Sequence, residues 1–162
     1  MAAGSWTAVG IICKRLRPGK DKNMASNKGV ITVTGRKKLC MAHAGDGSLP
    51  KIAKMVWGDG GVDDQGVPKE TTGTEVGLYN KLLEKEIEGY SYVNEEKTTC
   101  RYKATLEKGE LTGKEISEMG LLDADGDLIA YRTFTRKGKD EDIPQEYDMD
   151  ENFLMEVQHG KF

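Results

Sequence analysis

Apolar and polar residues alternate along much of the second half of the chain, a pattern typical of half-buried β-strands. From Thr99 to Leu106 the side chains of Cys100, Tyr102, Ala104 and Leu106 alternate with polar ones. The segments "KEISEMGLLD" and "DLIAYRTF" follow as two more predicted strands. Three such strands in succession favour an antiparallel sheet.

The first half of the chain predicts a helix between two strands. The segment "GVITVTG" contains a β-branched strand at residues 30–33, and Thr34 is a candidate N-cap for a helix over residues 36–44 that ends at Gly45. The apolar run before Gly58, "IAKMVWG", is the next predicted strand. We therefore expect an α+β fold with a mainly antiparallel β-sheet or sandwich, one short N-terminal helix and extended terminal arms.

Composition divides the chain into three parts. Residues 1–28 end in "LRPGKDKNMASNK", which lacks periodicity, and are predicted to form an N-terminal arm and basic linker. Residues 29–150 form the predicted compact domain. In residues 151–162, Phe153, Met155 and Val157 alternate with polar residues, so this part is either a last strand that completes the chain's own core or an arm for a neighbour.

The hairpin around "DADGD" raises the question of a metal site, because calcium loops also space acids at alternate positions. An EF-hand loop that begins at Asp123 needs glycine at its sixth position and glutamate at its twelfth. Those positions hold Leu128 and Phe134. Asp125-Gly126 between two alternating segments instead predicts a tight hairpin, with positive φ at both residues. We expect no bound metal.

Composition and charge exclude several classes of function. The longest apolar run is far shorter than the roughly 18 residues of a membrane span, so no membrane insertion is expected. Three widely separated cysteines suggest neither a disulfide framework nor a zinc site. The two histidines lie far apart, and no catalytic triad or cofactor motif is recognisable, so we expect no enzyme and no cofactor.

The charges are unevenly distributed. Residues 1–57 hold 11 Lys and Arg but two acids, whereas 25 acids follow them. Such asymmetry suits either nucleic acid or neighbours that meet basic end to acidic end. Because no RNA-binding aromatic motif and no zinc-finger spacing are present, we expect protein neighbours and no nucleic acid.

The long polar loop of residues 58–74 is a candidate contact surface. Trp57 and Tyr79 flank it and could stack on a sugar, which gives the alternative function of a small receptor- or glycan-binding module. A third hypothesis is an enzyme that takes its acid and base from Asp59, Asp63, Asp64 and Glu75.

Four segments in order resemble the phage tail-collar fibre family: "TGRKKLCMAHAG", "LPKIAKMVWGDGG", Leu78-Tyr79-Asn80, and "ISEMGLLDADGDLIAYRTF" followed by "KGKD". This family forms the particle-proximal part of tail fibres in phages and phage-tail-like bacteriocins. The resemblance covers roughly residues 29–150. Its hairpin pattern falls on Glu118, Met119, Gly120, Leu121, Asp123, Asp125, Gly126, Leu128, Ile129 and Ala130.

The resemblance implies a non-enzymatic structural component of the virion or tail-like particle, assembled in the bacterial cytoplasm. Its partners would be copies of itself, as a trimer or hexamer, and other tail, baseplate or fibre proteins, with a bacterial surface receptor as a further candidate. Fibres of the family usually continue into a long shaft, so we expect a short adaptor or baseplate-associated component. Arms that add strands to a neighbour would bear its load. The candidate anchors in these arms are Trp6, Ile11, Ile12, Phe153, Met155 and Val157.

Overall fold

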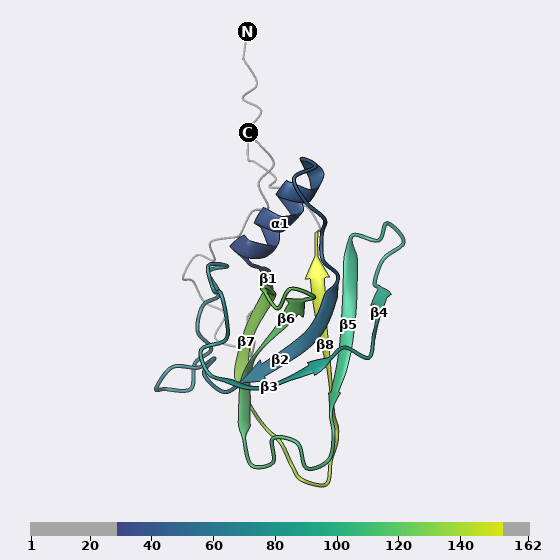
Figure 1. Ribbon diagram of the computed structural model, residues 1–162. Coiled ribbons are helices and arrows are strands. Elements are labelled where there is room, and N and C mark those ends of the chain that lie inside the picture. The colour runs from purple at the N-terminus through teal and green to yellow at the C-terminus, as the bar shows by residue number, and fades with distance from the viewer. Residues whose placement is uncertain (1–28, 154–162) are drawn as a thin grey trace, which may run out of the picture.

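The computed structural model describes residues 29–153, which form two antiparallel sheets and one helix (Figure 1). The larger sheet has the order β1-β7-β6-β2-β3, and the smaller has the order β4-β5-β8. The predicted α+β class with mainly antiparallel sheet is confirmed. The elements are β1 (Val30–Ile31), α1 (Val33–His43), β2 (Ile52–Gly58), β3 (Lys81–Glu86), β4 (Gly89–Tyr92), β5 (Thr99–Leu106), β6 (Glu115–Asp123), β7 (Leu128–Gly138) and β8 (Gln145–Asn152).

The main core lies between the two sheets. Trp57 of β2 is fully buried there and meets the ring of Tyr147 of β8 edge-on, with 5.8 Å between ring centroids. Met119 and Leu121 of β6 are buried in the same cluster. The residue between them, Gly120, and the preceding Glu118 are also buried, so both faces of the central strand β6 are covered.

The N-cap of helix α1 lies two residues earlier than the predicted cap at Thr34. The N-cap is Thr32, whose hydroxyl oxygen accepts a hydrogen bond from Gly35 N at 3.1 Å and donates to the carbonyl of Leu128 at 2.6 Å. The bond to Leu128 joins the N-cap to β7, and this tertiary contact explains why Thr32 rather than Thr34 caps the helix. Gly45 ends the helix with a φ of +80°, as expected of a residue just past a helix C-terminus.

The three strands predicted in succession, β5, β6 and β7, do not all belong to one sheet. β5 pairs with β4 and β8, whereas β6 pairs with β2 and β7 in the other sheet. The connection over residues 107–114 crosses between the sheets, with Gly109 N and Gly113 N donating to the carbonyls of Glu141 and Lys139. Alternation identifies a strand but not its neighbour, which is why the sequence did not separate the two sheets.

Strand β8 lies earlier than the predicted last strand and continues past Asp150 to Asn152. Tyr147 and Met149 point into the core, while Asp148 and Asp150 face outward, opposite Lys103 and Arg101 of β5. Two residues that the sequence analysis assigned to the terminal arm therefore belong to the sheet.

Candidate functional site

Glu118 of β6 is the most heavily bonded side chain on the outer face of the larger sheet. It is fully buried, and its carboxylate accepts hydrogen bonds from Gly60 N at 3.1 Å, Asn80 N at 2.8 Å and Tyr79 N at 3.0 Å. The hydroxyl of Tyr131 on β7 donates a fourth bond at 2.8 Å. A buried carboxylate is costly unless such donors compensate for lost hydration, so this cluster holds both ends of the β2–β3 connection against the sheet.

Tyr131 remains protonated in this environment. Burial and the hydrogen bond to Glu118 both raise the pKa of the Tyr131 phenol well above its usual range. A phenol held in this state is a permanent donor to Glu118 rather than an acid that exchanges protons near neutral pH. The pair has the properties of a structural link.

The glycines of "WGDGG" let the connection approach β6 closely. A Cβ atom at Gly58 would lie 2.3 Å from the carbonyl oxygen of Asn80, and one at Gly61 would lie 2.2 Å from that of Ser117. Gly61 N also donates to Ser117 Oγ at 2.9 Å. These glycines serve a packing contact, in agreement with the sequence-based preference for a turn over a phosphate site.

The loop of residues 58–74 is tied to the sheet and folded on itself. Thr133 Oγ1 donates to the carbonyl of Lys69 at 2.6 Å, and Val33 N donates to that of Gly73 at 2.7 Å. Asp63 Oδ1 accepts two backbone bonds inside the loop, and Glu75 accepts bonds from residues 72 and 73. Asp59 Oδ1 also accepts a bond from Asn80 Nδ2, so three of the four acids of the enzyme hypothesis take part in hydrogen bonds that shape the connection.

The two aromatic residues predicted to flank a binding loop lie in different environments. Trp57 is wrong as a contact or stacking residue, because β2 is covered on both faces and its indole is fully buried. Tyr79 is 56% exposed, with the ammonium of Lys69 4.0 Å from its ring centroid. Tyr79 alone of the pair can reach a partner.

The "DADG" hairpin has a different turn from the predicted one. Gly126 N donates to the carbonyl of Asp123, Asp123 N donates to that of Asp127, and only Gly126 in this turn has a positive φ, +85°. This is a three-residue loop with a glycine bulge rather than a two-residue turn. Asp123 stabilises it further, because its Oδ1 accepts from the N–H groups of Asp125 and Asp127 at 3.0 Å each.

The three aspartates of the hairpin share one ammonium group. Lys38 of α1 places its Nζ 2.5, 3.0 and 2.6 Å from carboxylate oxygens of Asp123, Asp125 and Asp127. Burial alone lowers the pKa of Lys38, but hydrogen bonds to the three carboxylates outweigh it and raise this pKa above its usual value. The acids that suggest a calcium loop thus hold the helix to the hairpin.

Replacing Lys38 should destabilise the fold. In Lys38→Met the carboxylate of Asp123, 1% exposed, would face two like charges without their cation, and we expect the free energy of unfolding to fall by about 2 kcal/mol. Lys37→Met, at the exposed neighbouring position, should change it by less than about 0.5 kcal/mol. Urea denaturation of both variants measures the difference, and equal stabilities would show that the cluster contributes nothing.

The remaining predicted contacts are only partly described. Phe153 is 40% exposed and follows β8, with its N–H bonded to the carbonyl of Thr98. Trp6, Ile11, Ile12, Met155 and Val157 lie outside the described residues. Sequence reasoning also missed an aromatic cluster, in which the exposed Tyr90 of the edge strand β4 packs near the exposed Tyr92 and near the half-buried Tyr102 of β5. The alternating tyrosines in "GYSYV" are the sequence signal that indicates this cluster.

Comparison with known proteins adds no functional assignment. No family model matches the chain, and neither a curated protein nor a solved structure does so. In the described part of the chain, no helix is long and apolar enough to cross a membrane.

Proposed function

We propose that this protein is a non-enzymatic structural component of a phage or phage-tail-like particle, which anchors or forms the fibre or baseplate attachment through oligomeric assembly. One observation carries the proposal. The segments that resemble the tail-collar fibre family, although far apart in sequence, pack against one another through Glu118 and Asp123.

The contacts join these segments pairwise. Lys38 of "TGRKKL" binds the aspartates of "DADGD", and Gly60 of "WGDGG" binds Glu118 of "SEMG". Tyr79 and Asn80 bind the same carboxylate, as does Tyr131 of "LIAYRTF". Fold-building contacts thus account for these residues of the pattern, which supports a structural role.

A structural role under mechanical load is supported by the hydrogen bonds of Glu118 and Tyr131. The carboxylate of Glu118 is occupied by four donors, and its neighbour Tyr131 is held as a permanent donor. The exposed apolar side chains Val67, Val76 and Tyr79 on the β2–β3 connection offer contacts to further copies or to other tail and baseplate proteins. Such a component would be made in the bacterial cytoplasm and carried in the particle.

The proposal is tested by the absolute mass of the full-length protein, measured by light scattering after size exclusion. We expect three or six times the 17.9 kDa of one chain, and a smaller species when residues 1–28 are deleted. A monomer at every concentration would contradict assembly through copies of the chain.

A glycan-binding module is the second candidate. Of the two stacking residues predicted for it, Trp57 is buried and only Tyr79 is exposed. The cluster of Tyr90, Tyr92 and Tyr102 offers another aromatic surface. Glycan-array binding that Tyr90→Ala abolishes would favour this candidate over the structural role.

A further inference from the structure

A small apolar pocket lies where the two layers separate beside α1. Its apolar lining includes Gly35 and Leu39 of the helix, Leu49 before β2, Ile52 at the start of β2, Ile129 of β7 and Phe153 after β8. Its volume is about 40 Å³, the space of a few water molecules. The pocket can therefore admit the end of one aliphatic side chain but not an indole ring.

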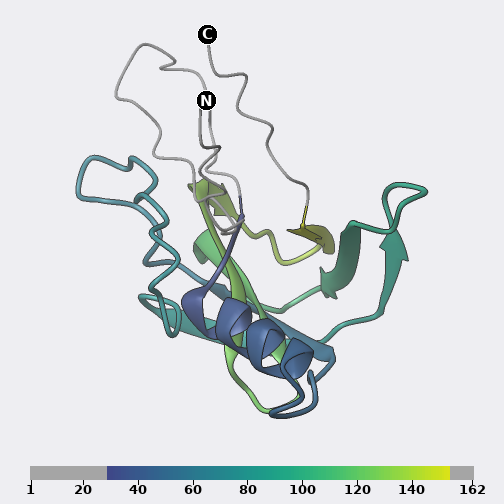
Figure 2. The same ribbon diagram turned by 90° about the horizontal axis from the view of Figure 1, so that it is seen from above.

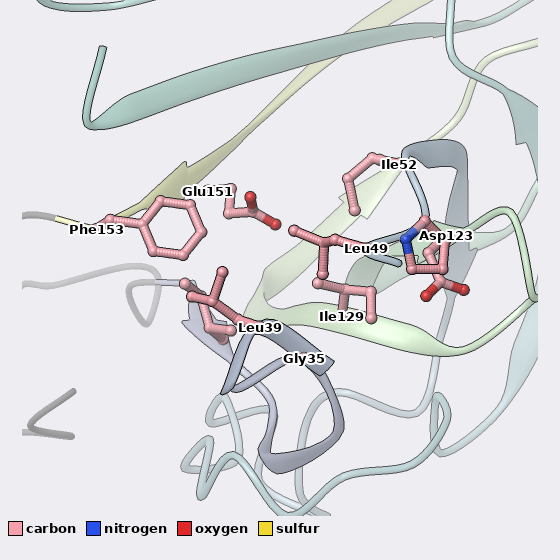
Figure 3. A pocket seen from close by; sticks show the side chains of 10 residues that line it. Gly35, Leu39, Leu49, Ile52, Asp123, Ile129, Glu151 and Phe153 are labelled. Atoms are coloured by element: carbon pink, nitrogen blue, oxygen red, sulfur yellow. The ribbon is translucent and has the colours of Figure 1, made fainter. Parts of the chain in front are cut away.

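Two carboxylates line this pocket, and Asp123 is already paired with Lys38, whereas Glu151 is not. Figure 3 shows the Glu151 side chain reaching from β8 toward Leu49, between Phe153 and Ile52. No cation among the described residues lies within ion-pair distance of it, and burial raises the pKa of Glu151 to about 7. An occupant that adds a positive charge beside an aliphatic group would match both features.

Both ends of the described chain come close to the pocket. Phe153, the last described residue, lines it, as does Ile31, two residues after Gly29. The view in Figure 2 shows α1 on one side of the molecule and the ribbon of β4 and β5 on the other, so the helix does not cover the smaller sheet. The rest of the chain therefore joins the described part within two residues of the pocket lining.

The sequence beyond these ends contains one segment with the required chemistry. Residues 1–28 carry six Lys and Arg and one Asp, whereas residues 29–153 carry 17 basic and 25 acidic residues, so their charges are complementary. Within this basic part, Ile11 and Ile12 are followed at once by Lys14 and Arg15. The other end, "LMEVQHGKF", has its first lysine seven residues after Leu154. The apolar-then-basic order favours residues 9–15.

We propose that the pocket binds residues 9–15 of this chain, with an isoleucine of the Ile11-Ile12 pair in the cavity and Lys14 or Arg15 paired with Glu151. The 14 residue steps from Arg15 to Gly29 span up to about 45 Å, enough to reach the pocket of a neighbouring copy. The inference rests on the proposed function only in one respect, namely that the segment joins one copy of the chain to another. The contact itself is independent of that role.

Amide hydrogen exchange of the full-length protein at pH 8 tests the contact. Residues 9–15 should exchange at least tenfold more slowly than a free peptide of the same sequence. Leu49→Lys, at a position that is 52% exposed, should return exchange to within twofold of the peptide rate. Ile143→Lys is the matched control, because Ile143 is 55% exposed but lies in the β7–β8 connection and does not line the pocket. Peptide-like exchange in the wild type, or equal effects of both variants, would overturn the proposal.

Charge reversal provides a second test. Glu151→Lys and the pair Lys14→Glu/Arg15→Glu should each remove the protection, and their combination should restore it to within threefold. Asp148→Lys, on the outward face of β8, should not rescue the arm variant. An NMR titration should find the pKa of Glu151 near its ordinary range in the wild type and near 7 in the arm variant. Failure of the rescue, with all variants folded by circular dichroism, would contradict the pairing.

Mass separates this inference from the proposed function. A protected segment in a monomer would support the pocket contact within one chain and remove the support for assembly. An oligomer whose residues 9–15 exchange freely would support assembly and overturn the pocket contact.

Discussion

Glu118→Ala should lower the free energy of unfolding by about 4 kcal/mol, and the melting temperature by about 12 °C, the largest loss expected from a single side chain here. The variant leaves the N–H groups of Gly60, Tyr79 and Asn80 and the hydroxyl of Tyr131 without their acceptor. It also opens a cavity under a connection that has no other side-chain tie to β6 except Ser117 among the bonds described. Urea denaturation measures the difference.

Two companion variants make the result specific. In Glu118→Gln the amide nitrogen can face Tyr131, whose hydroxyl can rotate to accept, so the loss should be about 2 kcal/mol. Glu115→Ala, at an exposed site of the same strand, should cost less than about 0.5 kcal/mol. If Glu118→Ala is within 1 kcal/mol of wild type, the carboxylate does not fasten the connection.

The elements predicted correctly are those set by neighbouring residues. The β6–β7 hairpin follows from local alternation around Asp125-Gly126, and β5 from its own period of two. The finer error at the hairpin has a physical cause, because a glycine bulge and a two-residue turn both use Gly126. The choice between them depends on Asp123, whose side chain bonds to the turn and to Lys38 of a distant helix.

The features missed depend on contacts between distant segments. The position of Trp57 before a polar loop predicts a stacking residue, yet the unbroken run of Met55, Val56 and Trp57 is typical of a strand buried on both faces. The acidic residues of β8 obscure its strand pattern in the sequence, although Tyr147 and Met149 alternate with Asp148 and Asp150. A glutamate in a strand gives no sign of burial. The sequence therefore predicts Glu118 as part of the β6–β7 hairpin, but not as the residue that joins this hairpin to the β2–β3 connection.

The glycines were the available signal for that link. Four of them, Gly58, Gly60, Gly61 and Gly120, lie in two segments that meet on one face of the sheet, and a Cβ atom on any of them would approach another atom to 2.9 Å or less. Gly120 needs the space for the side chain of Leu128 and the carbonyl of Ala130. Clustered glycines without positive φ therefore mark a place where two backbones touch.

Gly61→Ala should reduce the free energy of unfolding by about 3 kcal/mol. Its methyl group would lie 2.2 Å from the carbonyl oxygen and 2.7 Å from the carbonyl carbon of Ser117, which belong to the central strand β6. Because that strand is paired on both sides, the loop must move instead. The movement breaks the bond from Gly61 N to Ser117 Oγ and strains the nearby bond from Gly60 N to Glu118.

Gly77→Ala is the matched control and should act in the opposite direction. Gly77 lies in the same connection, has no positive φ, and would place its Cβ within 4 Å of nothing. The alanine should therefore leave the fold intact and raise the free energy of unfolding by up to about 1 kcal/mol, because it restricts the unfolded chain. Thermal and urea denaturation of both variants separates the two effects of an added methyl group. Equal stabilities would mean that the connection does not approach β6 as closely as Gly61 requires, and that the contact with Glu118 is looser than its four hydrogen bonds indicate.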